Sequence, residues 1–288
     1  MRVIYQISEL RALRRELPGV FGLVPTMGAL HAGHASLIRR ARAECDHVGV
    51  SIFVNPAQFA PGEDLAKYPR VLEKDLALLE SLAVDVVWTP TPEIMYPAGY
   101  QTWIAVENIS APLEGAIRPG HFRGVATVVA KLFNAFTPDI AYFGQKDAQQ
   151  AAVLRRMTLD LNFPVKIAVC PTVREGDGLA LSSRNAYLNP NERQAATVLY
   201  RALVAAKEKF DAGERSAEIL RSVMRAVIAA EPLANAQYVS VADPDTLEEL
   251  LEIRDQALLS LAVRIGNTRL IDNFLLISAP PATAFPSP

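Results

Sequence analysis

Two histidines and two glycines lie close together in a segment that follows an apolar run near the N-terminus. Residues 25–34 read PTMGALHAGH, so His31 and His34 flank Gly33, and Gly28 stands three positions before His31. Glycine lets a backbone approach a phosphate, and a following helix N-terminus offers free N–H groups and the positive end of the helix dipole. Imidazoles at that end can donate hydrogen bonds to developing phosphoryl charge. The segment therefore predicts a site for a phosphate-containing ligand.

Other interpretations of this segment compete. Gly28 and Gly33 have the spacing of a P-loop, but His34 and Ala35 stand where a P-loop needs Lys and Ser or Thr. The histidines lack the i,i+4 spacing and the intervening Glu of a zinc-binding helix. A third alternative is an ordinary glycine turn with two surface histidines and no ligand. A histidine–glycine turn of this form also resembles those of the class I aminoacyl-tRNA synthetases and the small nucleotidylyltransferases, which implies nucleotidyl transfer but no particular substrate.

Two further segments carry groups suited to a small acid. Residues 53–59 read FVNPAQF, and Asn55 and Gln58 offer neutral donors and acceptors that suit a small hydroxy acid, although Asn-Pro also initiates ordinary turns. Residues 114–125 read EGAIRPGHFRGV, a polar loop before a long apolar helix. Its Arg118, His121 and Arg123 can hold a carboxylate or phosphate, or they can be a solvated helix entry.

Two more segments carry groups suited to phosphates. Residues 142–150 read YFGQKDAQQ, where Lys146 would contact a phosphate, while Asp147 and Gln150 also match a helix capping box. Residues 181–185 read LSSRN, whose hydroxyls and arginine can close over a polyphosphate and exclude water from a reactive intermediate. An ordinary interdomain linker is the alternative for the second of these segments.

The elements that must position these groups alternate between strand and helix. Short apolar runs predict strands at 20–24, 48–54, 84–88, 140–143 and 165–170. Apolar residues at helical spacing lie between them, at 37–45, 72–79, 125–136 and 148–161. This alternation predicts an α/β fold, a Rossmann-like parallel sheet with covering helices, in which ligands bind at the carboxyl ends of the strands.

The pattern changes near residue 175, where we place a domain boundary. Two helices, at 195–203 and 219–228, are followed by strands at 237–241, 258–265 and 269–275, which predicts a smaller C-terminal α+β domain. Asn189, Pro190 and Glu192 form a helix start signal. The expected organisation is a catalytic domain at 1–175, an α+β lid domain at 176–277 that carries the Ser-Ser-Arg-Asn loop, and a disordered proline-rich tail at 278–288.

Composition excludes several classes of function. The 288 residues are 50% hydrophobic with a formal net charge of -2, so the chain can bury a large core and has no charge bias toward nucleic acid or anionic membrane. Two cysteines, Cys45 and Cys170, are too few for a disulfide framework. The first residues lack the apolar core of a signal peptide, and no apolar run approaches about 18 residues. We therefore expect a cytoplasmic protein.

Taken together and in this order, the five motifs resemble the pantothenate synthetase family, the AMP-forming pantoate–β-alanine ligases. The resemblance runs to about Leu276 and leaves out the tail. It implies that ATP, with Mg²⁺, and pantoate react to a pantoyl adenylate, which β-alanine then converts to pantothenate and AMP. It also implies a homodimer, with no nucleic acid or membrane partner and no organic prosthetic group. The rivals are a nucleotidylyltransferase, an aminoacyl-tRNA synthetase and a non-catalytic nucleotide-binding module.

The family's site residues carry over to this chain position by position. His34, His31 and Lys146 would be catalytic, and the residue at the His34 position is described in the family as a proton donor. Pantoate and β-alanine would bind Gln58, Gln150, Met27 and Asn55. The predicted ATP-binding residues are Met27, Gly28, Ala29, Leu30, His31, Ala32, Gly33, His34, Gly144, Gln145, Lys146, Asp147, Val173, Leu181, Ser182, Ser183 and Arg184.

Overall fold

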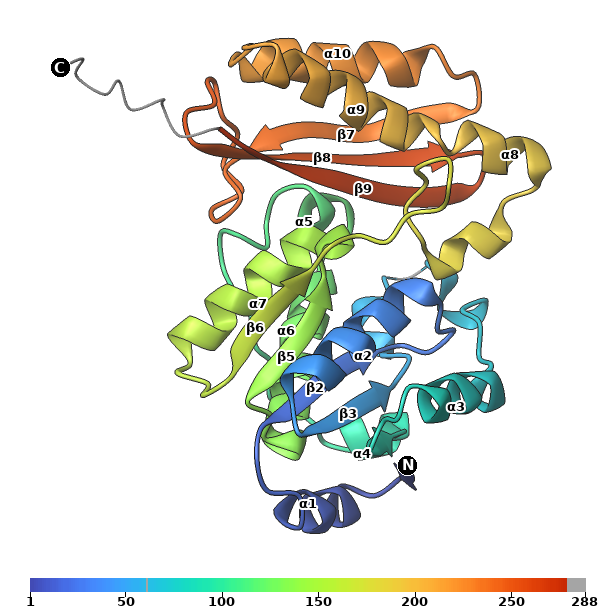
Figure 1. The fold of residues 1–288 in the computed structure, drawn as a ribbon, viewed down its shortest axis with the longest axis vertical. Coiled ribbons are helices and arrows are strands. Elements are labelled where there is room, and N and C mark those ends of the chain that lie inside the picture. Colours follow the sequence, from blue (N-terminus) through green and yellow to red (C-terminus); the bar gives the residue numbers. More distant parts are fainter. Residues whose placement is uncertain (61, 279–288) are drawn as a thin grey trace, which may run out of the picture. The chain divides into compact units, whose positions relative to one another are not determined.

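The computed structural model describes residues 1–60 and 62–278, and the chain divides into two compact units, the first from Met1 to Tyr187 and the second from Leu188 onward. The first unit is built on a six-stranded parallel sheet in the order β1-β4-β3-β2-β5-β6. Figure 1 labels β2, β3, β5 and β6 of this sheet. Its strands are β1 (Arg2–Ile4), β2 (Phe21–Thr26), β3 (His47–Ile52), β4 (Val86–Trp88), β5 (Ile140–Gly144) and β6 (Lys166–Cys170).

Both faces of this sheet are covered by helices, which explains why its strands are mainly apolar. On one face, Leu37, Ile38 and Ala41 of α2 and Leu79 of α3 pack with strand residues such as Val24. On the other face, the ring of Phe136 in α6 contacts those of Phe21 and Trp88. The α-helices of this unit are α1 (Ile7–Arg15), α2 (Ala32–Glu44), α3 (Leu72–Ser81), α4 (Pro92–Met95), α5 (Glu114–Ile117), α6 (His121–Phe136) and α7 (Ala148–Asp160), and its 3₁₀ turns are η1 (Pro56–Gln58), η2 (Asp64–Ala66), η3 (Gln145–Asp147) and η4 (Ser183–Tyr187).

The strand order sets where a ligand can bind. From β2 the chain moves outward through β3 and β4, and then returns to the other side of β2 as β5. The carboxyl ends of β2 and β5 are therefore neighbours at the point where the strand order reverses, which is the usual ligand site of an open α/β sheet. The segments after these two strands hold the histidine–glycine turn and Lys146.

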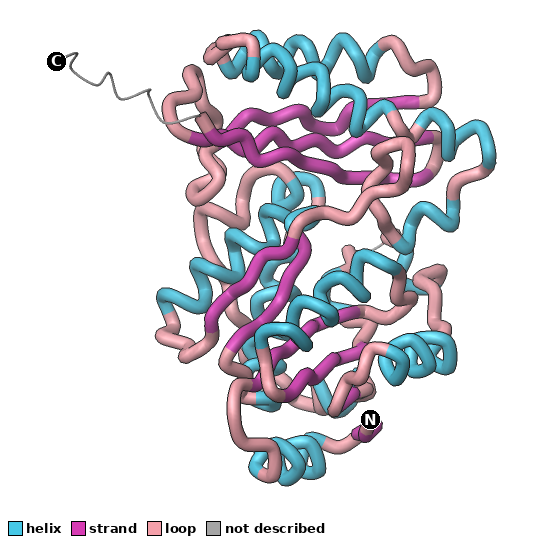
Figure 2. Tube along the Cα trace, viewed as in Figure 1, coloured by secondary structure: helices cyan, strands magenta, loops and turns pink. Residues whose placement is uncertain are grey.

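The second unit has helices followed along the chain by an antiparallel sheet. Figure 2 colours these helices cyan and these strands magenta. The helices are α8 (Pro190–Ala195), α9 (Val198–Asp211) and α10 (Ala217–Ala229), and the strands β7 (Ala234–Ala242), β8 (Gln256–Ile265) and β9 (Thr268–Ile277) pair in the order β7-β8-β9. The predicted start signal lies at the beginning of α8, where Asn189 and Glu192 form a capping box. The fold class expected from the sequence is thus confirmed, a parallel α/β sheet with a smaller α+β unit.

Three details differ from the sequence-based expectation. Strand β1 and helix α1 were not anticipated, because they are short and partly exposed. The single helix expected around 195–203 is two helices, and the Thr197 hydroxyl donates to the Gln194 carbonyl at the break, a contact that bends helices. The first unit continues past residue 175 to Tyr187. The tail expected at 278–288 lies outside the described residues apart from Ser278.

The additional segment of the first unit is tied to η2 and the residues after it. Arg184 pairs with Asp64 through two hydrogen bonds of 3.0 Å, the Ser183 and Tyr68 hydroxyls are 3.4 Å apart, and the Tyr187 hydroxyl donates to the Lys67 carbonyl. These contacts across more than a hundred residues explain why the loop expected in the lid domain belongs to the first unit. None of the helices in the described part of the chain has the length and apolar character needed to cross a membrane.

Candidate active site

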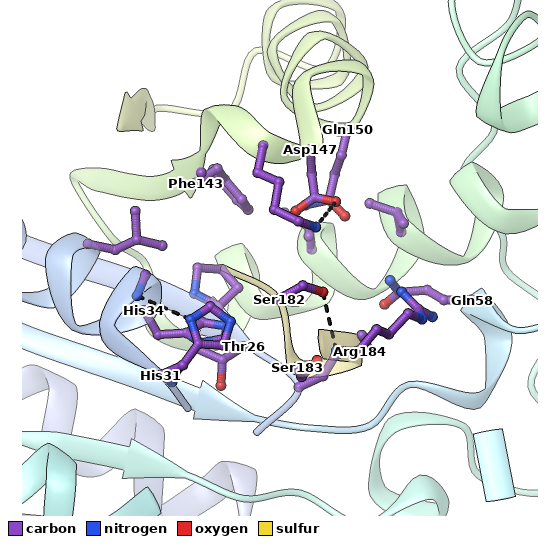
Figure 3. Close-up of a pocket in the computed structure, with 18 of the residues that line it drawn as sticks. Thr26, His31, His34, Gln58, Phe143, Asp147, Gln150, Ser182, Ser183 and Arg184 are labelled. Atoms are coloured by element: carbon purple, nitrogen blue, oxygen red, sulfur yellow. Dashed lines mark hydrogen bonds and ion pairs between the residues drawn. The ribbon is translucent and has the colours of Figure 1, made fainter. Parts of the chain in front are cut away.

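A cavity of about 230 Å³ opens at the carboxyl ends of β2, β3 and β5, and all of its lining residues belong to the first unit (Figure 3). All five sequence motifs contribute residues to its lining. The segment 114–125 contributes Arg118, His121 and Val125. Its polar and charged lining consists of Thr26, His31, His34, Ser51, Gln58, Tyr68, Arg118, His121, Lys146, Asp147, Gln150, Thr172, Ser182, Ser183 and Arg184.

The two histidines of the first motif cap the helix that they begin. Nδ1 of His31 accepts from the Gly33 N–H at 3.1 Å, and Nδ1 of His34 accepts from the His31 N–H at 3.3 Å. Because both Nδ1 atoms accept, each neutral ring carries its proton on Nε2. The N–H of Gly33 is therefore not free for a ligand, contrary to expectation, and the donors that the turn can offer include imidazole N–H groups.

Both histidines are held in the neutral form. Burial and then the neighbouring His31 ring lower the pKa of His34 to about 3. Asp147 opposes this shift, and the Lys146 ammonium adds a smaller lowering. Burial and Lys146 likewise lower the pKa of His31. The ring centroids lie 4.2 Å apart, so a second positive charge there would be costly. In the absence of a bound anion, each ring is a neutral hydrogen-bond donor.

The turn between β2 and α2 is held by an acidic residue from another element. Gly28 and Ala29 have positive φ angles of 82° and 50°. The two carboxylate oxygens of Asp75 in α3 accept from the N–H groups of Ala29 and Leu30 at 2.9 and 2.8 Å. Asp75 thus stabilises a strained conformation that aims the histidines at the cavity.

The predicted residues of this turn divide into two groups. Met27, His31, Gly33 and His34 line the cavity, whereas Gly28, Ala29, Leu30 and Ala32 do not. The second group shapes the turn. No sequence motif pointed to Asp75, whose role depends on the contact between α3 and the turn.

The turn after β5 places a positive charge opposite the histidines. Gly144, Lys146, Asp147 and Gln150 line the cavity, whereas Gln145 does not. Asp147 precedes α7 but makes no side-chain cap, so the alternative of a capping box with Gln150 is wrong. Its carboxylate lies 3.9 Å from the Lys146 ammonium, and Figure 3 shows Asp147 and Gln150 side by side above the cavity.

The serine–arginine segment contributes a second cation and two hydroxyls. Leu181, Ser182, Ser183 and Arg184 line the cavity together with Val173. The Ser182 hydroxyl accepts from the Arg184 N–H at 3.2 Å. Burial alone would raise the pKa of Asp64, but its hydrogen bonds to Arg184 hold that pKa below the usual range. Arg184 is therefore anchored by a carboxylate before any anionic ligand arrives.

Gln58 lines the cavity, whereas Asn55 is buried behind it. Asn55 is 1% exposed and donates from Nδ2 to the Gln58 Oε1 at 2.9 Å. Asn55 does not line the cavity, so it cannot touch a ligand there in this conformation. Its place behind Gln58 depends on the η1 turn that both residues share, which spacing alone did not reveal.

A third cation lies near Gln58. Arg118 binds Glu63 through two hydrogen bonds of 2.7 and 2.9 Å and donates to the Gln58 carbonyl. His121 donates from Nδ1 to the same carbonyl and accepts from Arg118 at Nε2; burial and the Arg118 charge lower its pKa to about 4. Arg123, the third candidate of this motif, instead lies over the Trp103 ring at 4.6 Å and does not line the cavity.

Comparison with known proteins identifies the family. The sequence model of the pantoate–β-alanine ligases matches residues 2–275. A pantothenate synthetase from Roseiflexus castenholzii is 66% identical over 276 residues, 96% of this chain and 99% of that protein. The chain belongs to the pantoate–β-alanine ligase family.

Solved structures of pantoate–β-alanine ligases have the same fold. The pantothenate synthetase of Thermus thermophilus superposes with a TM-score of 0.91 at 48% identity, covering 95% of this chain and 99% of that one. The pantoate–β-alanine ligase of Francisella tularensis, solved in complex with a β,γ-ATP compound and β-alanine, superposes with a TM-score of 0.79 at 37% identity over 96% and 97% of the two chains. The chain is thus a ligase enzyme that forms pantothenate.

Proposed function

We propose that this ligase works in two steps within the cavity of the first unit. The pantoate carboxylate attacks the α-phosphorus of ATP, and pyrophosphate leaves, which gives pantoyl adenylate. The amine of β-alanine then attacks the acyl carbon, so that pantothenate forms and AMP leaves. Adenylation is needed because AMP is a far better leaving group than oxide, and neither step needs a nucleophile from the enzyme.

The observation that carries this proposal is the convergence of anion-binding and neutral groups in one cavity. The neutral imidazoles of His31 and His34, the Lys146 ammonium and the Arg184 guanidinium line it together with Gln58 and Gln150. The first set suits a polyphosphate and the second a small hydroxy acid. The complex of the Francisella tularensis relative with a β,γ-ATP compound and β-alanine supports the same choice of ligands.

The proposed roles follow from chemistry and position. His34, with His31, donates to oxygens of the α-phosphate as their charge grows in the transition state, and Lys146 stabilises the same charge. Because His34 is neutral in the ligand-free site, its Nε2 N–H is available as a hydrogen-bond donor to the α-phosphate. Gln58, Gln150 and Met27 contact pantoate, and Gln58 also lies near β-alanine. The remaining nucleotide contacts are Gly33, Gly144, Asp147, Val173, Leu181, Ser182, Ser183 and Arg184.

Six of the predicted residues do not line the cavity and act indirectly in this scheme. Gly28, Ala29, Leu30 and Ala32 shape the turn, Gln145 begins η3, and Asn55 holds Gln58.

Mg²⁺ enters as part of the substrate MgATP, because that ion keeps several waters and prefers phosphate oxygens. Among the described residues, no group of three or more His, Cys, Asp or Glu side chains is placed to hold a metal.

We also propose a cytoplasmic homodimer. The two cysteines are buried free thiols, which is typical of a reducing compartment. The dimer rests on the resemblance to the family. Light scattering would test it, and a particle with the mass of a single chain at micromolar concentration would rule it out.

Product analysis by mass spectrometry tests the reaction. The protein is incubated with MgATP and pantoate, with and without β-alanine. Without the amine we expect pyrophosphate and enzyme-held pantoyl adenylate, and with it pantothenate and AMP. Well-folded protein that consumes no ATP in a pantoate-dependent way would overturn the scheme. A nucleotide conjugate as product would favour a nucleotidylyltransferase, and ATP retention without pyrophosphate would favour a non-catalytic module.

A further inference from the structure

The buried amide of Asn55 has a hydrogen bond at every polar position. Its Oδ1 accepts from the Ala57 N–H at 3.2 Å and from the Tyr96 hydroxyl at 2.8 Å. Its Nδ2 donates to the Gly124 carbonyl at 3.2 Å and to the Gln58 Oε1 at 2.9 Å. With two acceptor sites and two donors filled, this amide cannot gain any further hydrogen bond.

Backbone groups fix which end of this amide is oxygen. The Ala57 N–H can only donate and the Gly124 carbonyl can only accept, so a flipped Asn55 amide would face both with the wrong partner. The orientation therefore does not depend on an arbitrary choice between nitrogen and oxygen.

The orientation of the Asn55 amide determines the orientation of the Gln58 side chain, which lines the cavity. Because Asn55 offers an N–H to Gln58, the Gln58 Oε1 turns inward, and its Nε2 is left to face the ligand. Nε2 makes no hydrogen bond within the part of the chain that the structure describes. Gln58 is thus set as a donor, and the ligand atom opposite must be an acceptor, such as a hydroxyl or carboxylate oxygen of pantoate.

Tyr96 supplies the one side-chain donor to this amide, and its ring is clamped on several sides. It stacks on Trp103 with centroids 5.7 Å apart and an interplanar angle of 19°, and it contacts Tyr100 edge-on at 5.1 Å and Phe53 at 6.4 Å. Burial and the neighbouring Tyr100 raise the pKa of Tyr96 to about 12, so the hydroxyl stays protonated and able to donate. Tyr96 does not line the cavity.

We propose that Tyr96 is a positioning residue of the pantoate subsite, which acts through Asn55 to present the amide N–H groups of Gln58 to the substrate. The inference rests on the proposed contact between Gln58 and pantoate. It adds a specificity rule, because a substrate analogue whose group opposite Gln58 can only donate would be rejected.

Tyr96→Phe tests this inference, because it removes only the hydroxyl and keeps the stacked ring. We expect kcat/KM for pantoate to fall by about tenfold, the loss typical of one buried hydrogen bond, with KM for ATP changed less than twofold. Tyr100→Phe is the matched control, since that ring belongs to the same aromatic cluster and its hydroxyl makes no hydrogen bond among the described residues. The control should keep the wild-type parameters.

A double-mutant cycle with Gln58→Ala distinguishes positioning from a general structural effect. If Tyr96 acts through Gln58, then Tyr96→Phe should lower kcat/KM for pantoate less than twofold in the Gln58→Ala background. Three results would each overturn the inference. One is a tenfold loss of kcat/KM for pantoate in both backgrounds, another is a KM for ATP that changes as much as the KM for pantoate, and the third is wild-type kinetics for Tyr96→Phe. Gln58→Ala alone leaving pantoate kinetics unchanged would instead overturn the proposed role of Gln58.

Discussion

Individual polar side chains in this site are oriented by backbone groups, which leaves their opposite ends to face the ligand. The N–H groups of Gly33 and His31 hold Nδ1 of His31 and His34. The Ala57 N–H and the Gly124 carbonyl hold Asn55 and, through it, Gln58. Donors fixed before the ligand arrives need no reorganisation when charge develops, and this preorganisation is the main source of electrostatic catalysis.

Replacing His34 with Ala tests this principle for the proposed adenylation. We expect kcat for pantoate-dependent pyrophosphate release to fall about 100- to 1,000-fold, as for a lost oxyanion donor, while the Kd for ATP changes about threefold or less. Rapid-quench assays and equilibrium titration measure the two quantities. His47→Ala is the control, because that histidine lies at the start of β3 and does not line the cavity. An unchanged rate for His34→Ala would remove His34 from the chemistry.

Secondary-structure elements bring the site together through close backbone contacts. Helix α6 approaches the η1 turn so closely that a Cβ on Gly124 would lie 2.1 Å from the Ala57 carbonyl oxygen. The same turn carries Gln58, and the Gly124 carbonyl binds Asn55. Glycine inside a helix is less favourable than alanine, by up to about 1 kcal/mol. The close contact explains why a glycine stands in the first turn of α6.

Substituting Gly124 with Ala should therefore disturb pantoate more than ATP. The methyl group must push η1 away, which moves Gln58 and breaks the Asn55 contact. We expect KM for pantoate to rise by about tenfold or more and the unfolding free energy to fall by about 1 to 3 kcal/mol, the usual cost of overpacking. Steady-state kinetics with each substrate varied separately, together with urea unfolding, provide the readout.

The comparison variant is Gly176→Ala, whose added Cβ would meet nothing within 4 Å. It should behave as wild type. If Gly124→Ala affects both substrates equally, the contact between α6 and η1 does not act on the pantoate side of the site in particular.

At the scale of the whole molecule, the site imposes an acid sensitivity on the first unit. His31, His34 and His121 have folded-state pKa values below the ordinary value of 6.5, mainly because each is buried. Below pH 6.5 these three histidines bind protons in the unfolded chain, whereas in the folded chain they stay neutral until the pH reaches their lower pKa values. The unfolded state is therefore favoured as the pH falls from 6.5 toward the folded pKa values, and nothing is lost from this source above pH 7.

Urea unfolding at pH 7 and pH 5 measures this effect. At pH 5 the unfolding free energy should be lower than at pH 7, by about 1 to 2 kcal/mol for each of His34 and His121. Tryptophan fluorescence reports the first unit alone, because both tryptophans, Trp88 and Trp103, lie in it. His34→Asn keeps an acceptor near the position of Nδ1 but cannot titrate, so its stability should fall less between the two pH values. Equal pH dependence of wild type and variant would contradict the neutral state of His34.

The sequence by itself determined the local elements and the groups that can do chemistry. The major strands could be predicted from apolar runs, because strands that are buried on both faces of a sheet are apolar. Helices α2, α3, α6 and α7 could be predicted from apolar residues at helical spacing. Four of the motifs follow a strand or lead into a helix, and the fifth lies in a polar loop. Their residues could therefore be named as candidate ligand contacts, and the combination of motifs was specific enough to indicate the family.

Only the tertiary structure decided which of those residues meet and what holds them. The strand order brings the ends of β2 and β5 together, and it depends on long-range pairing that no local pattern encodes. Asp64, Asp75 and Tyr96 stood in no motif, since their partners lie tens of residues away in the chain. The boundary at Tyr187 was missed for the same reason, because the contacts that hold residues 183–187 to 64–68 form only once the chain has folded.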